Sequence, residues 1–412
     1  MSGPTMTRTP ASEIVRPNWS VLTLAFIAVV LDGYDTIALG LSVPALAAEW
    51  NEAPSHFTPA LSLTSLGVAL GYIAVGRLTA RFGCRNVILF AVGVFTIGSL
   101  LTAWSTSIVE LTALRFITGL GLGAVMPAAV AQTTALNPVK FRQSIAVFVT
   151  MGISLGALIA GVAGSQLVRN FGWPSVFVVG AIASAILFPF LWFGLPDERK
   201  VIGEVPVADA KHSASVARLF DPEVRTRTLL LWVFSFLVFS VFYIFSSWLP
   251  TLLTSYGFST GLAPLGSAAL GVGSIIGAGV LILGATKFKM TSVLAGTTAA
   301  AIVFLVISAF LGPDKALLLI VFAGVGLGLQ AGMIGQAAVA VSIYPQRTAA
   351  TGVGWTSSMG RLGSVVGPII GGALIGLGFG TSSIVLLACI PVAAALLVIL
   401  ALGRMRQPAA AV

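Results

Sequence analysis

Long apolar runs separated by short polar groups fill the chain from residue 19 to residue 403. A helix needs roughly 20 apolar residues to cross the hydrocarbon core of a bilayer. Runs of that length predict twelve membrane-spanning helices, at 19–47, 57–78, 87–105, 109–135, 143–168, 174–195, 227–255, 260–285, 291–312, 316–342, 347–377 and 381–403. The pattern therefore predicts an all-α membrane protein.

The two halves of the chain repeat each other. When the sequence is shifted by 206 residues, Pro44 falls on Pro250 and Gly67 falls on Gly273. Repeated halves around a midplane site are typical of transporters, and we expect two pseudo-symmetric six-helix bundles. The expected organisation is a cytoplasmic tail, a first bundle, a cytoplasmic linker, a second bundle and a second cytoplasmic tail, at residues 1–18, 19–195, 196–226, 227–403 and 404–412.

Composition strengthens this interpretation. Apolar residues make up 57% of the chain and charged residues 8%, whereas a water-soluble domain has roughly 25% charged residues. A soluble protein and a disordered one are both excluded. The net charge of +9 comes from bases in the short loops, eighteen on the side of the N-terminus and two on the other side. This bias predicts cytoplasmic termini in an inner membrane and argues against a nucleic-acid partner.

The residues that would support redox or metal chemistry are few and scattered. The chain has two cysteines, Cys84 and Cys389, and two histidines, His56 and His212, with no metal-ligand spacing. A membrane enzyme would need a nucleophile and base, or metal ligands, inside the spans, and no histidine falls there. We therefore expect no enzyme activity, no metal and no cofactor.

Four ionisable residues fall inside the predicted spans: Asp32, Asp35, Arg115 and Arg361. A charge at this depth costs about 2.5–3.5 kcal/mol on insertion scales and marks a functional site by default. Asp32 and Asp35 share one helix face, and two close carboxylates in a medium of low dielectric constant cannot both ionise cheaply. We expect the pair to carry a coupling proton, with Arg115 as its partner. Which aspartate carries the proton stays open, and a permanent salt bridge is the alternative.

Arg361 lies nearer the midplane, in the half that has no intramembrane acid. A guanidinium there suits bidentate capture of a substrate carboxylate. Gln330, Trp355 and Tyr34 are the further substrate-binding candidates, the amide through hydrogen bonds and the rings through stacking. Helix packing is the competing explanation for each of them, and also for Gln132, Gln336, Tyr72, Tyr243 and Trp248.

Three motifs resemble a known family. The string GRLTARFGCRNV after the second span is similar to the loop motif of the major facilitator superfamily, and LRFITGLGLG is similar to its fourth-span signature. LDGYDTIALG and GRLGSVVGPIIGG resemble the aromatic acid:proton symporter branch. The residues that carry the gating loop motif are Gly76, Arg77, Arg81, Gly83 and Arg85.

This resemblance implies a proton-coupled symporter that imports a small aromatic carboxylate, similar to hydroxybenzoate, by alternating access. Its expected partners are the proton, that acid and the lipid bilayer, and we expect a monomer. A proton-coupled drug antiporter of the same superfamily is the alternative. The loop motif departs from the family at Ala80, where the family has an acid, and at Cys84, where it has a base. Because Arg81 and Arg85 lack that acidic partner, we expect a looser cytoplasmic gate.

Overall fold

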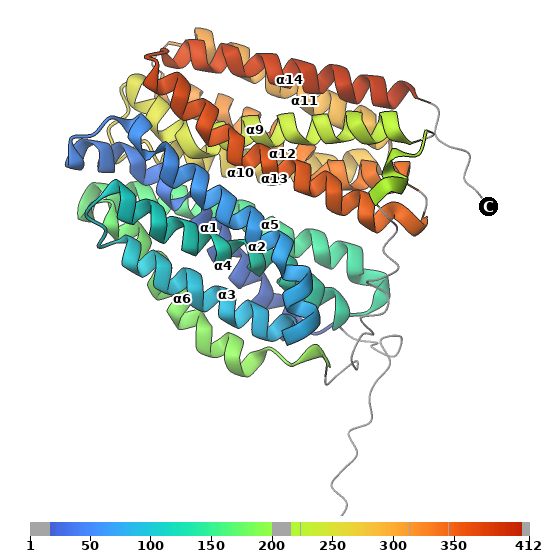
Figure 1. The fold of residues 1–412 in the computed structure, drawn as a ribbon. Coiled ribbons are helices and arrows are strands. Elements are labelled where there is room, and N and C mark those ends of the chain that lie inside the picture. The colour runs from blue at the N-terminus through green and yellow to red at the C-terminus, as the bar shows by residue number, and fades with distance from the viewer. Residues whose placement is uncertain (1–16, 200–215, 223, 313, 345, 406–412) are drawn as a thin grey trace, which may run out of the picture.

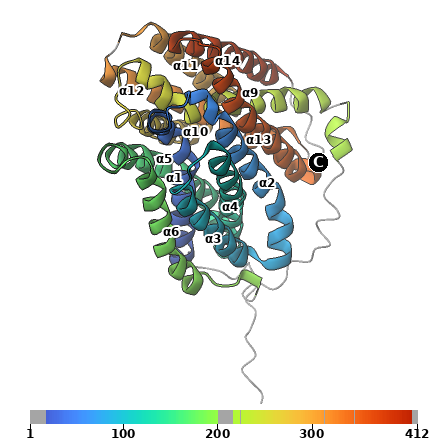
Figure 2. The ribbon, with the colours of Figure 1, turned by 60° about the vertical axis from the view of Figure 1, so that its left-hand side comes forward.

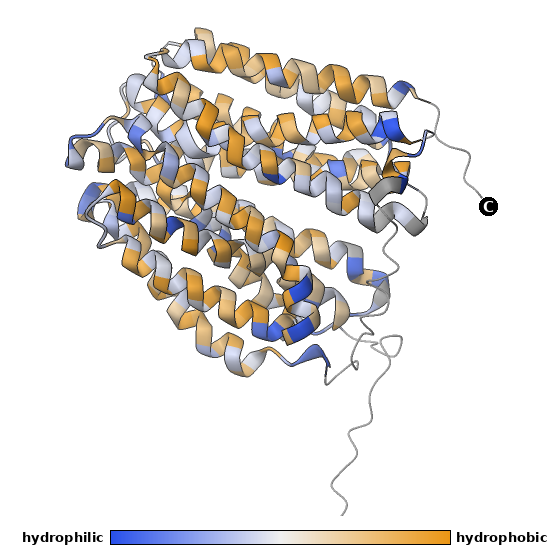
Figure 3. Ribbon diagram, in the orientation of Figure 1, coloured by the Kyte–Doolittle hydropathy of each residue, from blue (hydrophilic) through white to orange (hydrophobic). Residues whose placement is uncertain are grey.

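The computed structural model describes residues 17–199, 216–222, 224–312, 314–344 and 346–405, and their regular secondary structure is entirely helical. The long helices are α1 (Trp19–Trp50), α2 (Thr58–Phe82), α3 (Cys84–Thr102), α4 (Ile108–Ala135), α5 (Arg142–Phe171), α6 (Pro174–Gly194), α9 (Arg225–Ser255), α10 (Leu265–Ala285), α11 (Met290–Phe310), α12 (Lys315–Ile343), α13 (Gln346–Gly376) and α14 (Thr381–Arg404). Twelve spans in the described part of the chain are long and apolar enough to cross a membrane, which confirms the predicted number (Figure 3).

Helix ends differ from the prediction where glycine or proline interrupts the backbone. Gly83 separates α2 from α3 with a φ of 83°, a conformation that a residue with a β-carbon adopts at a steric cost. The break falls later than the predicted end of the second span at residue 78, so α2 continues to Phe82. The next helix, α3, starts at Cys84, before its predicted start at residue 87. In the second half α10 begins at Leu265 and not at residue 260, because Pro264 precedes its first turn.

The helices form two bundles, α1–α6 and α9–α14, which lie one above the other in Figure 1 and remain distinct after the rotation of Figure 2. The same glycine contact recurs in each. A β-carbon on Gly67 of α2 would overlap the carbonyl oxygen of Phe116 in α4. One on Gly273 of α10 would overlap that of Ala323 in α12. Small residues let these backbones touch, so the sequence repeat is a structural one and the two pseudo-symmetric bundles are confirmed.

The bundles touch each other most closely at one end. There a β-carbon on Gly40 of α1 would meet backbone atoms of Ser247 in α9, and one on Gly161 of α5 would meet backbone atoms of Ala268 in α10. Ser165 of α5 also donates a hydrogen bond of 2.7 Å to a carbonyl oxygen of the second bundle. We call this the sealed end. The basic end is the opposite one, where the α2–α3, α4–α5 and α10–α11 turns carry arginine and lysine.

The predicted domain boundaries stay predictions. Most of each tail and much of the linker at 196–226 fall outside the described residues. The described end of the linker contains a short 3₁₀ helix, η4 (Val216–Phe220), beside the start of α9. The hydroxyl of Thr228 in α9 joins the two by donating to the carbonyl oxygen of Leu219 at 2.9 Å.

Candidate functional site

A cavity of about 470 Å³ lies between the two bundles. Its walls come from α1, α2, α4 and α5 on one side and from α9, α10, α12 and α13 on the other. The lining continues toward the basic end through Ala131, Thr150 and Ala337, whereas the bundles close against each other at the sealed end. Binding pockets for small molecules typically enclose about 300–1,000 Å³, so the cavity is large enough for a monocyclic organic compound.

Arg361 of α13 is the only charged side chain among the described residues that line this cavity. Its guanidinium carbon lies 4.7 Å from the ring centre of Tyr72, which belongs to α2 of the first bundle. Its Nη1 donates to the hydroxyl of Tyr243 in α9 at 3.4 Å. Gln330 of α12 lines the same space. The cavity therefore offers one cation over the Tyr72 ring and beside the Tyr243 hydroxyl, with an amide on a neighbouring helix.

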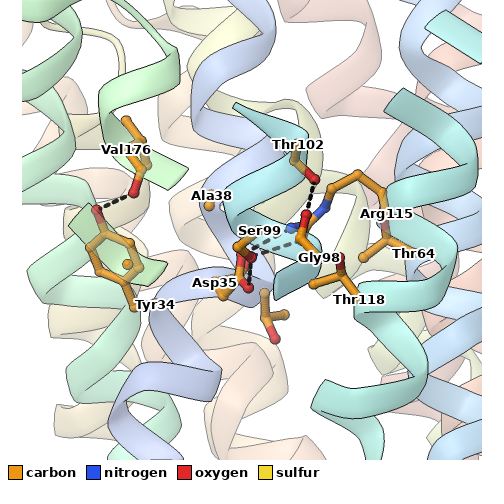
Figure 4. A network of polar contacts seen from close by, with 12 residues as sticks. Tyr34, Asp35, Ala38, Thr64, Gly98, Ser99, Thr102, Arg115, Thr118 and Val176 are labelled. Carbon is orange, nitrogen blue, oxygen red and sulfur yellow. Dashed lines mark hydrogen bonds and ion pairs between the residues drawn. The ribbon is translucent and has the colours of Figure 1, made fainter. Parts of the chain in front are cut away.

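Asp35 and Arg115 form a salt bridge inside the first bundle (Figure 4). Nη1 of Arg115 donates to Oδ1 of Asp35 at 2.9 Å, and Nη2 donates to the Asp35 carbonyl oxygen at 3.0 Å. The hydroxyl of Ser99 in α3 donates to the other carboxylate oxygen. The ring of Phe177 lies 5.4 Å from the guanidinium carbon. Each Asp35 oxygen is thus occupied by a donor from α3 or α4.

Asp32 has a different environment. It is buried, and its Oδ1 accepts a hydrogen bond of 3.3 Å from Thr36, one turn further along α1. No salt bridge to Asp32 occurs among the described residues. Thr36 lines the cavity together with Tyr243, the residue that accepts from Arg361. Asp35 and Arg115 therefore form a closed pair inside the first bundle, whereas Asp32 adjoins the cavity through Thr36, and Arg361 lines that cavity from the second bundle.

Two predicted substrate residues lie away from the cavity lining. Tyr34 is buried between α1 and α6, where its hydroxyl donates to the carbonyl oxygen of Val176 at 3.0 Å. Trp355 stacks on Trp232 of α9 with ring centres 5.7 Å apart. Because each ring is already occupied by a partner outside the lining, the structure does not bring these two residues to Arg361. Tyr72 and Tyr243 take the places beside it.

The sequence did not identify the serine hydroxyl groups that line the cavity or the one that donates to the salt-bridged Asp35. Ser99, which donates to Asp35, has no sequence signal that separates it from other serines in apolar helices. The same holds for Ser274 and Ser246, which line the cavity. Membrane helices commonly satisfy serine hydroxyls with their own backbone carbonyls, so only the position in three dimensions identifies these three.

The loop motif is held within the first bundle. Glu198, just after α6, accepts hydrogen bonds from the backbone amides of Cys84 at 2.5 Å and Arg85 at 3.4 Å, and so caps the start of α3. The Arg85 side chain donates to the carbonyl oxygens of Trp192 and Leu195, at 2.5 and 2.8 Å. A carboxylate from after α6 therefore stands beside a motif that lacks its own acid. The remaining motif residues, Gly76, Arg77 and Arg81, are exposed.

Comparison with known proteins identifies relatives over nearly the full length. A model of the Major Facilitator Superfamily matches residues 25–334. A gallate transporter of Pseudomonas putida is 30% identical, over 94% of this chain and 92% of its own length. A 3-(3-hydroxy-phenyl)propionate transporter of Escherichia coli K12 is 33% identical, over 91% of each. Among solved structures, a variant of the nucleoside transporter NupG matches with a TM-score of 0.74 at 16% identity, covering 94% of this chain and 99% of that one.

Proposed function

This chain belongs to the Major Facilitator Superfamily, in the branch of the aromatic acid transporters, and on that premise we propose that it imports a small hydroxylated aromatic carboxylate together with protons. The family consists of membrane transporters and not of enzymes. The twelve spans make the chain a multi-pass membrane protein. The excess of bases in the loops at the basic end supports a cytoplasmic position for that end and for both termini.

One observation carries the choice of substrate: among the described lining residues Arg361 is the single cation, and it lies over the Tyr72 ring and beside the Tyr243 hydroxyl. A planar guanidinium binds a carboxylate through two parallel hydrogen bonds. Aromatic side chains favour offset or edge contacts with another ring. Both relatives are named for hydroxylated aromatic acids, which have a carboxylate and a ring of this kind. Gln330 is a suitable donor or acceptor for a ring hydroxyl.

The arrangement of the bundles supports alternating access in which the present state is open to the cytoplasm. The cavity reaches toward the basic end, and the close contacts through Gly40 and Gly161 lie at the sealed end. Rocking the bundles about the cavity would separate those contacts and close the opposite end. Protons are the expected driving ion because an inside-negative potential opposes anion entry by about 2.3 kcal/mol per charge per 100 mV.

The test is uptake by proteoliposomes that contain the purified chain. Labelled 4-hydroxybenzoate, gallate and 3-(3-hydroxyphenyl)propionate are presented from an acidic exterior to a neutral interior, with protein-free liposomes as the control for passive entry. At least one acid should accumulate above its exterior concentration, and a protonophore should abolish the accumulation. If none of these acids accumulates, and a lipophilic cation is instead expelled in exchange for entering protons, the chain is a drug antiporter and the proposal is wrong.

A further inference from the structure

The two aspartates of α1 differ in their surroundings. Arg115 and Ser99, the partners of Asp35, belong to α4 and α3 of the same bundle (Figure 4). Asp32 accepts a hydrogen bond from Thr36, which lines the cavity, and the cation that lines the same cavity is Arg361, which belongs to α13 of the other bundle. Arg361 is also tied to both bundles, because it lies over Tyr72 of the first and donates to Tyr243 of the second. Only the Asp32 arrangement therefore spans the interface that must move.

Alternating access treats each bundle as a largely rigid body, so contacts inside a bundle persist while contacts across the interface change. A proton drives transport only if its binding energy differs between the two states. A carboxylate whose partners move with it binds a proton with nearly the same energy in both states. The cluster of Asp35, Arg115 and Ser99 meets that description. Asp32 instead adjoins the cavity through Thr36, so its distance from Arg361 of the other bundle changes as the bundles rock.

Counting charges around the cavity adds a second constraint. Before a substrate binds, an ionised Asp32 would balance the charge of Arg361 across the cavity. A substrate carboxylate bound to Arg361 would leave one negative charge too many in a medium of low dielectric constant, which is costly. Protonation of Asp32 removes that charge. The other groups facing Asp32 or its partners are Asp35, already paired with Arg115, and the neutral hydroxyls of Thr36, Tyr72 and Tyr243.

From this geometry we infer that Asp32, and not Asp35, carries the coupling proton, and that one proton enters with each substrate carboxylate bound at Arg361. The inference rests on the proposed function and assigns roles within the same site. Asp35 is then a permanent structural anion that holds α1 against α3 and α4. Transport of a monocarboxylate is electroneutral, because the cavity charge is the same before and after loading.

The first experiment compares Asp32→Asn with Asp35→Asn in the proteoliposome assay. Asp32→Asn should lose accumulation driven by the pH gradient, so that interior and exterior concentrations become equal. It should keep exchange of labelled for unlabelled substrate at equal pH, because its amide mimics the protonated carboxyl. Asp35→Asn should lower the yield of folded protein on size-exclusion chromatography, and its folded fraction should still accumulate substrate. Retained accumulation in Asp32→Asn overturns the inference, as does a folded Asp35→Asn variant that exchanges but does not accumulate.

A second pair of variants, with smaller changes, tests the inference if an asparagine variant fails to fold. Thr36→Val and Ser99→Ala each remove one hydroxyl, the donor to Asp32 and the donor to Asp35 respectively. Losing the donor makes the ionised form of Asp32 less favourable, so Thr36→Val should move the midpoint of the pH dependence of uptake upward by about half a pH unit. Ser99→Ala should leave that midpoint in place. A larger shift in Ser99→Ala than in Thr36→Val assigns the proton to Asp35.

The stoichiometry is tested separately with valinomycin and potassium gradients that impose a membrane potential. At a fixed pH gradient, an inside-negative potential of 100 mV should leave the initial rate of monocarboxylate uptake unchanged. Several-fold stimulation would mean a second proton and would overturn the ratio of one to one. Failure of the wild-type chain to respond to pH or protonophore refutes the proposed function itself, whereas a responsive wild type with the reversed variant pattern refutes only the assignment to Asp32.

Discussion

Replacing Arg361 by glutamine tests the central claim about the cavity. Arg361 is the only charged side chain among the described lining residues, and its guanidinium lies 4.7 Å from the Tyr72 ring centre and within 3.4 Å of the Tyr243 hydroxyl. The variant keeps a polar side chain of similar reach but removes the charge and the two-pronged donor. We expect folded protein with weakened binding of the carboxylate.

The magnitude follows from the bonds that are lost. A hydrogen bond to a charged group contributes about 1.5–3 kcal/mol, and each 1.4 kcal/mol is about tenfold in affinity. Arg361→Gln should therefore raise the Kd of the preferred acid by roughly 10- to 150-fold. Arg361→Lys should recover only part of this loss, because an ammonium lacks the planar fork that matches a carboxylate.

Isothermal titration calorimetry on detergent-purified protein measures the effect, with two controls. The methyl ester of the same acid has the ring but no negative charge, so its affinity should change less than threefold in Arg361→Gln, a difference of about 0.65 kcal/mol. Lys287→Gln removes one positive charge from the exposed turn between α10 and α11, and it should leave acid binding unchanged. The reasoning is refuted if ester and acid lose affinity equally, because Arg361 would then maintain the shape of the cavity without binding the carboxylate.

Three further predictions concern the scaffold around the site. Arg115→Met leaves the Asp35 carboxylate buried without its cation and should destabilise the fold by about 3–5 kcal/mol. Differential scanning fluorimetry should record a clear fall in Tm, and an unchanged Tm would mean that the pair contributes little. Gly273→Ala places a β-carbon on the Ala323 carbonyl oxygen and should disrupt the α10–α12 packing, whereas Gly279→Ala, with open space around the new methyl group, should elute on size-exclusion chromatography like wild type. Glu198→Ala removes the acceptor from the first amides of α3 and should cost about 0.5–2 kcal/mol, with uptake under a pH gradient retained; equal thermal stability of the variant and wild type would contradict the capping role.

Much of the fold could be predicted from the sequence, because the bilayer imposes strong local requirements on each membrane-spanning segment. A run of about 20 apolar residues must be helical, since lipid satisfies no backbone hydrogen bonds. The repeat that matched Gly67 with Gly273 was equally visible, and it reappears as the same close contact between the second and fourth helices of each bundle. Errors were confined to helix ends such as the start of α10, where Pro264 delays the helix.

Only part of the candidate site could be predicted from the sequence. Setting aside the charged residues of loops and helix ends left the four intramembrane ones, because a charge inside a span is rare and costly in lipid. The sequence could not decide between Asp32 and Asp35, which share one helix face. Among the aromatic residues, Trp355 was favoured over Tyr72 because it lies six residues before Arg361 in the chain. Tyr72 belongs to the other half of the chain, and only the packing of α2 against α13 brings it over Arg361.

The sequence by itself determined the medium, the number of spans, the duplicated architecture and the identity of the costly charges, since each follows from the solvation of residues or from their order along the chain. The tertiary structure alone decided where the charges lie: Arg115 pairs with Asp35 inside one bundle, and Arg361 of the second bundle lines the cavity that Asp32 adjoins through Thr36. Partner choice depends on the rotation of each helix and on the crossing of helices far apart in sequence. Those are fixed by the sum of many small contacts, such as the glycine contacts between α2 and α4, and no local pattern encodes them.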